Sequence, residues 1–272
     1  MWSQDDHKLL EALTPDAVLF VGDLGNGEIR FIKEIKEIKI PTAVVLGNHD
    51  RGNDFSGYQL KSQIDLLGEK DCSWSRKIWS SPPLVIVGAR PCSAGGGYYL
   101  SPQMRAVFGP VSLSESIERI VDSSLDTPED LPLIILAHSG PTGLGSYAHS
   151  LCGRDWKKPE IDWGDKDLEL AIDKIKEARS VDLVVFGHMH HHLKRRKGVR
   201  NTFIMDEKRS IAYLNAASVP RKGVDVNKKL ISHFSWVEFN DGKLTHVSHR
   251  WFCPDASIAY QEDLYNHSMN GV

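Results

Sequence analysis

The sequence predicts an α/β fold in which parallel strands end in polar residues at one edge of a sheet. Apolar runs at residues 17–21 and 42–46 have the length and composition of buried strands, and each leads directly into a polar turn. Between them, residues 29–40 repeat apolar side chains at helical spacing and carry Lys/Glu pairs on the other face. Because strands that alternate with helices usually lie parallel, both polar turns should reach the same edge.

The other elements follow from the same two periodicities. Helical spacing predicts helices at residues 2–13, 29–40, 114–123 and 166–178. Apolar, β-branched runs predict buried strands at residues 17–21, 42–46, 84–88, 133–137 and 181–185. Antiparallel strands closing a second sheet are expected at residues 211–215, 232–239 and 244–250. No repeat, low-complexity tract or linker interrupts the chain, so we expect one domain over residues 1–272.

Composition limits the classes of function. Of the 272 residues, 41% are apolar and 25% charged, as in ordinary soluble globular proteins. No apolar run reaches the length of a membrane span, and a net charge of −3 indicates neither a membrane nor a nucleic-acid partner. The four cysteines form no Cys-x-x-Cys pair, which favours reduced thiols. We expect a soluble, intracellular protein, cytoplasmic by default, or located in a plastid if a plant chain has lost its N-terminus.

Polar residues with metal-binding side chains follow four of the expected strands. Asp23 and Asn48 follow the first two, His138 follows residues 133–137, and His188 and His190 follow residues 181–185. Each has another explanation, such as a turn, a helix cap or a core histidine, but their coincidence at strand ends favours one site. A carboxylate, a carboxamide and three imidazoles suit Mn²⁺, Fe²⁺ or Zn²⁺.

These motifs, in this order, resemble the calcineurin-like metallophosphoesterase superfamily. The residues that carry the resemblance are Gly22-Asp23, Gly47-Asn48-His49-Asp50, His138 and Gly187-His188-x-His190. Residues 93–97, 137–145 and 152–156 are similar to a branch of that superfamily found in cyanobacteria and plants. The resemblance implies a four-layer α/β/β/α sandwich with its site at the carboxyl ends of the strands.

The resemblance also implies roles. Asp23 would bridge two divalent ions, Asn48, His138 and His188 would complete the shell of one ion, and His190 would serve the other. A water activated between the ions would attack the phosphorus of a phosphate ester. His49 would act as general acid or electrostatic stabiliser, with Asp50 orienting its ring; the alternative for His49 is a structural role outside the metal shell.

The superfamily pattern begins with Asp-x-His at the end of a first central strand, which we do not find here. Asp5-Asp6-His7 matches the letters, but leucines at helical spacing follow at once, so we expect a helix start there. We therefore expect an N-terminally shortened domain that lacks the first central strand. Two interpretations stay open: a shortened form of a two-ion enzyme, or a binding or scaffold protein that holds one ion or none.

A phosphorylated small molecule, as a mono- or diester, is the expected substrate, and the sequence does not indicate an oligomeric state. Gly95, Gly96 and Gly97 could let their amides approach a phosphate, or could simply form a tight loop. Arg154 could attract an anionic substrate, or merely solvate its loop. The basic residues 194–200 are the only indication of a protein or nucleic-acid phosphate, and a solvated hairpin loop is the competing interpretation.

Overall fold

The parallel strands form the middle of a six-stranded sheet in the computed structural model, which describes residues 2, 4–195 and 197–267. The strand order is β3 (Arg76–Ser80), β4 (Pro83–Gly88), β5 (Leu133–Leu136), β6 (Leu183–Phe186), β8 (Ile211–Asn215) and β7 (Phe203–Asp206). From β4 to β8 the strands pair parallel, and β3 and β7 add antiparallel edges. The carboxyl ends of β5 and β6 therefore meet at one edge.

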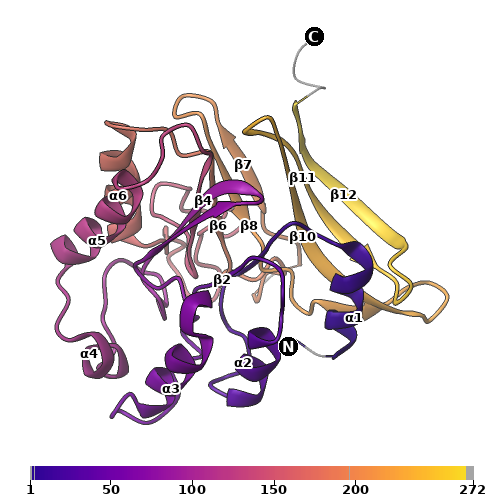
Figure 1. The fold of residues 1–272 in the computed structure, drawn as a ribbon, viewed down its shortest axis with the longest axis horizontal. Coiled ribbons are helices and arrows are strands. Elements are labelled where there is room, and N and C mark those ends of the chain that lie inside the picture. Colours follow the sequence, from indigo (N-terminus) through magenta and orange to yellow (C-terminus); the bar gives the residue numbers. More distant parts are fainter. Residues whose placement is uncertain (1, 3, 196, 268–272) are drawn as a thin grey trace.

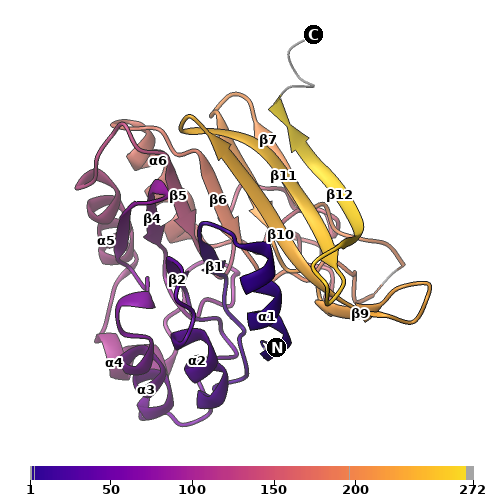
Figure 2. The same cartoon turned by 45° about the vertical axis from the view of Figure 1, so that its right-hand side comes forward.

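Two smaller sheets cover one face of this sheet (Figures 1 and 2). The first pairs β1 (Val18–Phe20) with β2 (Thr42–Val44) in parallel, and the second has the order β12 (Ile258–Asn266), β11 (Lys243–Phe252), β10 (Leu230–Asn240) and β9 (Lys222–Val224). Ile86 and Ile134 of the large sheet belong to one buried cluster with Ala43 of β2 and Val247 of β11. The core between the sheets thus brings the end of β1 and β2 near the ends of β5 and β6.

Helices form the outer layers. Alternate residues of the large sheet, such as Val85 and Ile135, point away from the smaller sheets and join a second buried cluster. The helices that contribute to this cluster are α1 (Gln4–Leu13), α2 (Ile29–Lys36), α3 (Tyr58–Leu67), α4 (Pro102–Phe108), α5 (Leu113–Leu125) and α6 (Lys166–Lys176). Helices α5 and α6 lie side by side beyond the large sheet, while α2 and α3 lie beside β1 and β2 (Figure 2). The expected α/β/β/α layering is confirmed.

One strand lies in a different sheet from the one expected. We expected residues 211–215 among the antiparallel strands of the second sheet, but β8 pairs parallel with β6 in the large sheet. All five residues of β8 are buried, as is typical of a strand covered on both faces. An apolar run of this kind indicates burial, but it does not indicate which neighbour the strand pairs with.

Trp2 and α1 lie where β1 and β10 approach each other. Within the described residues, β1 has β2 as its only strand partner. The Trp2 ring packs edge-on against Phe20 of β1 and Phe234 of β10, at centroid distances of 5.0 and 6.3 Å. Asp6 is fully buried and accepts hydrogen bonds of 3.0 and 2.9 Å from Arg221. The Asp5-Asp6-His7 segment is helical, as expected, and is not a strand-end ligand pair.

Candidate metal centre

The turns after β1 and β2 approach each other through two glycines. Gly22 has φ +90°, and a Cβ added there would lie 2.4 Å from the Gly47 nitrogen. A Cβ on Gly47 would lie 2.3 Å from Oδ1 of Asp23. No larger residue fits either position without moving the turn, so the Gly-Asp and Gly-Asn-His motifs need glycine on steric grounds.

Two of the donor residues have strained backbones. Asp23 has φ +55° and His188 has φ +61°, in the left-handed region that non-glycine residues seldom adopt. Such strain persists only where the surrounding structure holds it, and it is concentrated at functional sites. Both residues contribute ligand atoms to the cluster that follows.

Asp50 joins the two turns. Its Oδ1 accepts hydrogen bonds from the Leu24 and Gly25 amides at 2.8 and 3.2 Å, and its Oδ2 accepts one from the Gly47 amide at 2.9 Å. Burial raises the pKa of Asp50, against the effect of these amides. Among the described residues no hydrogen bond joins Asp50 to the His49 ring. The expected ring-orienting contact is therefore absent, because both carboxylate oxygens already bind backbone amides, and Asp50 acts on the loop instead.

Donors from four strand ends converge. The ligand atoms of Asp23, His138 and His188 all lie within 4.8 Å of one another. The Asn48 Oδ1 lies 3.0 Å from Nε2 of His138 and 3.0 Å from Nδ1 of His188. The structure thus brings together four of the five expected ligands, although they are far apart along the chain.

The orientation of His138 shows that these donors fit a cation. Its Nδ1 lies 2.6 Å from the Val21 carbonyl oxygen, which can only accept a hydrogen bond. In a neutral ring this places the proton on Nδ1 and leaves a lone pair on Nε2. That lone pair faces the Asn48 oxygen and, at 3.5 Å, the Asp23 carboxylate. Three electron-rich atoms facing one another are stabilised by a divalent ion between them.

The electrostatics of the centre favour its metal-binding protonation states. Burial, together with the neighbouring His138, lowers the pKa of His188 to about 3, so its ring is neutral at physiological pH. Burial alone would raise the pKa of Asp23, but the adjacent His138 and the His49 amide outweigh it and lower the pKa. A neutral imidazole and an ionised carboxylate are the forms that coordinate a metal.

His49 and His190 lie at the margin of the centre. The backbone amide of His49 donates a 3.0 Å hydrogen bond to Oδ1 of Asp23, and the exposed His49 ring lies close enough to affect the charge of Asp23. His190 is exposed and does not belong to the converging group. Burial of part of its ring and the nearby Lys194 charge lower its pKa. The Asp23 charge acts on the His190 ring, so the two side chains lie near each other at the margin of the centre.

Comparison with known proteins agrees with this geometry. A family model described as calcineurin-like phosphoesterase matches residues 4–192, which is more than half of the chain and includes every strand-end donor. The chain belongs to the calcineurin-like phosphoesterase family. No curated protein matches this phosphoesterase. One solved crystal structure aligns over 95% of this chain and 92% of its own at 12% identity and a TM-score of 0.49, too distant to carry an inference.

The glycine-rich loop of the phosphoesterase does not offer its amides to a ligand. The Gly95 amide donates to the Ser93 hydroxyl at 3.1 Å, and the Gly96 and Gly97 amides donate to carbonyl oxygens of Trp163 and Gly164 at 2.7 and 3.0 Å. The expected phosphate contact through these amides is wrong, because each amide already has a protein acceptor. The tight-loop alternative holds: a Cβ on Gly95 would lie 2.2 Å from the Trp163 carbonyl oxygen.

Arg154 also has a structural position. Only 8% of its surface is exposed. Its Nη2 donates to the Pro159 carbonyl at 2.7 Å, and its guanidinium lies 4.9 Å from the centre of the Trp163 ring. The expected role in attracting substrate is therefore not supported, because the charge is buried against its own loop.

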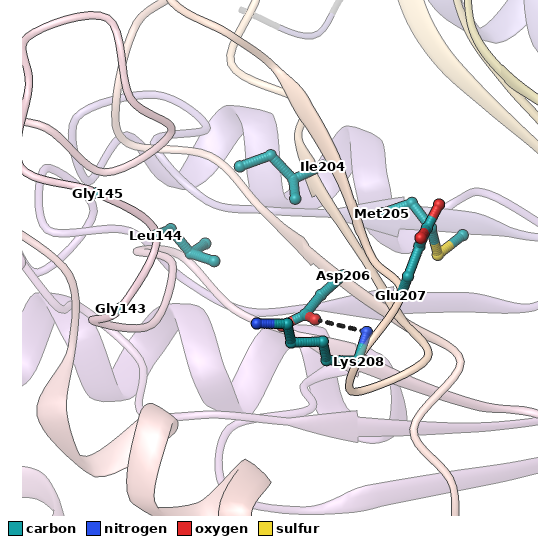
Figure 3. A pocket seen from close by; sticks show the side chains of 8 residues that line it. All are labelled: Gly143, Leu144, Gly145, Ile204, Met205, Asp206, Glu207 and Lys208. Atoms are coloured by element: carbon teal, nitrogen blue, oxygen red, sulfur yellow. Dashed lines mark hydrogen bonds between the residues drawn. The ribbon is translucent and has the colours of Figure 1, made fainter.

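A hollow of about 580 Å³ elsewhere on the phosphoesterase lies between residues 143–145 and 204–208 (Figure 3). Leu144 and Ile204 line it, and the Lys208 amide donates a 3.1 Å hydrogen bond to Asp206 at its edge (Figure 3). None of the metal donors lines this hollow. This hollow is therefore not the candidate metal site, whatever its size.

Two supporting residues escaped the sequence analysis. Asn215 is fully buried at the end of β8, and its Nδ2 donates a 2.7 Å hydrogen bond to the Met189 carbonyl, between the two histidines of His-x-His. Asn215 could have been found from the sequence, because it is a polar residue at the end of an apolar strand, like the metal donors. Arg200, which contacts the His190 carbonyl, lies in a basic run that we interpreted as solvated, so nothing local distinguished it. Its exposed fraction is 4%, and the solvated interpretation is wrong for this residue.

Within the described residues, no helix is both long and apolar enough to cross a membrane. All four cysteines are free, as expected, and all four are buried.

Proposed function

We propose that this protein hydrolyses a phosphate ester of a small molecule with the help of divalent metal ions. The observation that carries the proposal is the fixed ring of His138, whose unprotonated nitrogen faces the oxygens of Asp23 and Asn48. Family membership supports the reaction class. The donor set of oxygen and imidazole ligands without thiolate favours Mn²⁺, Fe²⁺ or Zn²⁺.

One ion would be held by Asp23, Asn48, His138 and His188, and a second by Asp23 and His190. When bound, such ions polarise phosphoryl oxygens and lower the pKa of a coordinated water. The protein supplies the geometry: the Gly22–Gly47 contact sets the spacing of Asp23 and Asn48, and Asp50 ties their turns together. Coordination positions that these residues leave unfilled would be available to substrate and water.

His49 is the residue we assign to proton transfer or charge stabilisation at the leaving group. Its amide is fixed on Asp23, so its ring stays beside the centre without being part of the converging donor group. An imidazole in this position, exposed to an incoming substrate, can donate a proton to an alkoxide or a hydrogen bond to a phosphoryl oxygen.

Hydrolysis of 4-nitrophenyl phosphate and of bis(4-nitrophenyl) phosphate with added Mn²⁺ tests this proposal. We expect turnover that His49→Ala reduces by about 10²- to 10⁴-fold, the usual effect of losing a general acid. His246→Ala is the matched control: His246 is a largely buried histidine on β11 that pairs with Asp263, and its loss should leave turnover unchanged. Equal rates in wild type and His49→Ala would exclude the assigned role.

A second function is favoured by the position of His190 outside the converging group. With one firmly held ion or none, the same fold would act as a binding or scaffold protein. This alternative predicts at most one Mn²⁺ per chain, and binding of a phosphate ester without turnover. Measured metal content together with the ester assay separates the two functions.

A further inference from the structure

Arg200 lies outside the part of the chain that the family model matches. It is nevertheless buried and contacts the carbonyl oxygen of His190, an expected metal ligand. We infer that Arg200 is a positioning residue that holds the His190 segment against the loop of residues 148–155. This inference rests on the proposed function, because it concerns the ligand of the second ion. It also provides a route by which the conformation of that loop can affect metal binding.

The Arg200 guanidinium binds three backbone carbonyl groups and one carboxylate of the loop. Its Nη1 lies 2.8, 2.7 and 2.6 Å from the carbonyl oxygens of Ala148, Ser150 and Gly153. Its Nη2 forms an ion pair of 3.2 Å with Asp155, which is itself 9% exposed. Three carbonyl oxygens converging on one nitrogen leave the turn little freedom while the guanidinium is present.

The same side chain holds the His190 segment from the other side. Its Nε donates a 3.2 Å hydrogen bond to the His190 carbonyl, and the backbone amide of Arg200 donates to the His191 carbonyl at 2.7 Å. The second oxygen of Asp155 accepts the Lys194 amide. The Arg200–Asp155 pair therefore fixes the chain at His190 and again four residues later.

Backbone anchoring matters here because the His190 ring is exposed. Within the described residues, no hydrogen bond to the ring of this exposed histidine is present, in contrast to His138 and His188. Asn215 fixes the Met189 carbonyl on one side of His190, and Arg200 fixes the His190 carbonyl itself. Together they set the backbone position from which His190 reaches toward the second ion.

Only arginine can make this set of contacts. Its planar guanidinium presents five N–H donors in a fixed fork, and here they reach the His190 carbonyl, the loop carbonyls and Asp155 at once. Lysine keeps the charge near Asp155 but offers donors from a single nitrogen. Arg200→Lys should therefore keep the ion pair and lose the link between the two segments.

The test compares Arg200→Lys with Arg179→Lys by titration with Mn²⁺ alone. Arg179 is also a buried arginine, 8% exposed against 4% for Arg200, and it bonds to the Leu131 carbonyl at 2.9 Å and to Thr127, away from the metal donors. Both variants should lower the unfolding temperature. We expect only Arg200→Lys to weaken the second Mn²⁺ site, by about 10- to 100-fold, while the first site is unchanged.

A metal-free readout accompanies the titration. In Arg200→Lys, backbone hydrogen exchange should accelerate together in residues 147–155 and 188–194, and Asp155→Asn should show a smaller change in the same segments. Two Mn²⁺ sites of wild-type affinity in Arg200→Lys, or equal weakening in Arg179→Lys, would overturn the inference. Absence of any Mn²⁺ binding by the wild type would instead contradict the proposed function. In that case the hydrogen-exchange experiment still tests the inference: faster exchange in only one of the two segments of Arg200→Lys would show that Arg200 does not hold them together.

Discussion

The surroundings of each histidine ring at the centre determine its protonation. The Val21 carbonyl sets the proton of His138, and burial keeps His188 neutral with a pKa of about 3. The position of both residues at strand ends made them predictable from the sequence. The contact with Val21 was not predictable, because every residue has a backbone carbonyl and the sequence does not indicate which one accepts a hydrogen bond from a given ring.

A histidine away from the centre gives a pH prediction at this scale. His249 on β11 is 6% exposed, and burial, with the nearby His191, lowers its pKa to about 4. Since the unfolded chain, with a pKa near ~6.5, binds the proton more readily, the stability contributed by neutral His249 is present above pH 6.5 and lost as the pH falls toward 4. The loss should amount to about 2 kcal/mol at pH 5 relative to pH 7.5.

His249→Asn tests this prediction. His249 Nδ1 lies 3.1 Å from the Ser235 hydroxyl, and asparagine can keep that hydrogen bond without titrating. Urea unfolding at pH 5 and 7.5 should show a smaller difference between the two pH values in the variant, by about 2 kcal/mol. An identical difference in both proteins would show that His249 is protonated as easily in the folded state as in the unfolded chain.

The elements were largely predictable, with boundaries that depended on distant residues. Helix α2 was expected to reach residue 40, but it ends at Lys36, and Lys70 donates to the carbonyls of Ile35 and Lys36 at 3.1 and 2.7 Å. A lysine some 34 residues away thus satisfies the helix end, which local periodicity cannot reveal. By contrast, α5 begins at Leu113, one residue before the expected start, and a local capping box between Ser112 and Glu115 fixes its beginning.

The paired turns after β1 and β2 give a prediction for Gly22→Ala. The substitution combines a left-handed backbone with a Cβ 2.4 Å from the Gly47 nitrogen and 2.7 Å from the His138 ring. We expect a loss of about 3 kcal/mol or more in unfolding free energy, together with loss of metal binding, because the neighbours that must move include a ligand.

Gly109→Ala is the control for backbone strain alone. Gly109 also has positive φ, +77°, but a Cβ there would meet nothing within 4 Å. Its loss in unfolding free energy should be about 1–2 kcal/mol, without an effect on metal affinity. If both alanine variants kept wild-type metal affinity, the close approach of the two turns would not be what positions Asp23.

At the scale of the whole molecule, the β1–β2 sheet and the large sheet bring the ends of four strands together at the candidate metal centre. Asp23 and Asn48 come from β1 and β2, while His138 and His188 come from β5 and β6, and the core between the sheets joins them. Alternating apolar strands and helices made the layers predictable. The assignment of β8 to the large sheet was not, because strand pairing depends on contacts between segments that burial patterns do not identify.

The support of the His190 segment is also decided at this scale. No strand other than β2 pairs with β1 in the described part of the chain, and Trp2 packs between β1 and β10. His190 therefore depends on the supports contributed by β8 and by Arg200. Asp23, Asn48, His138 and His188 do not share this dependence, because their ligand atoms already converge.

The most direct test of the centre is Mn²⁺ titration of the purified protein, with wild type and His188→Gln compared under identical conditions. At least one Mn²⁺ per chain should bind to the wild type and raise its unfolding free energy, by about 2.7 kcal/mol at a free concentration 100 times the dissociation constant. His188→Gln should weaken that site by about 100-fold or more. Stoichiometric Mn²⁺ binding that the variant leaves unchanged, or no binding by the wild type at millimolar Mn²⁺, would contradict shared coordination by the four strand ends.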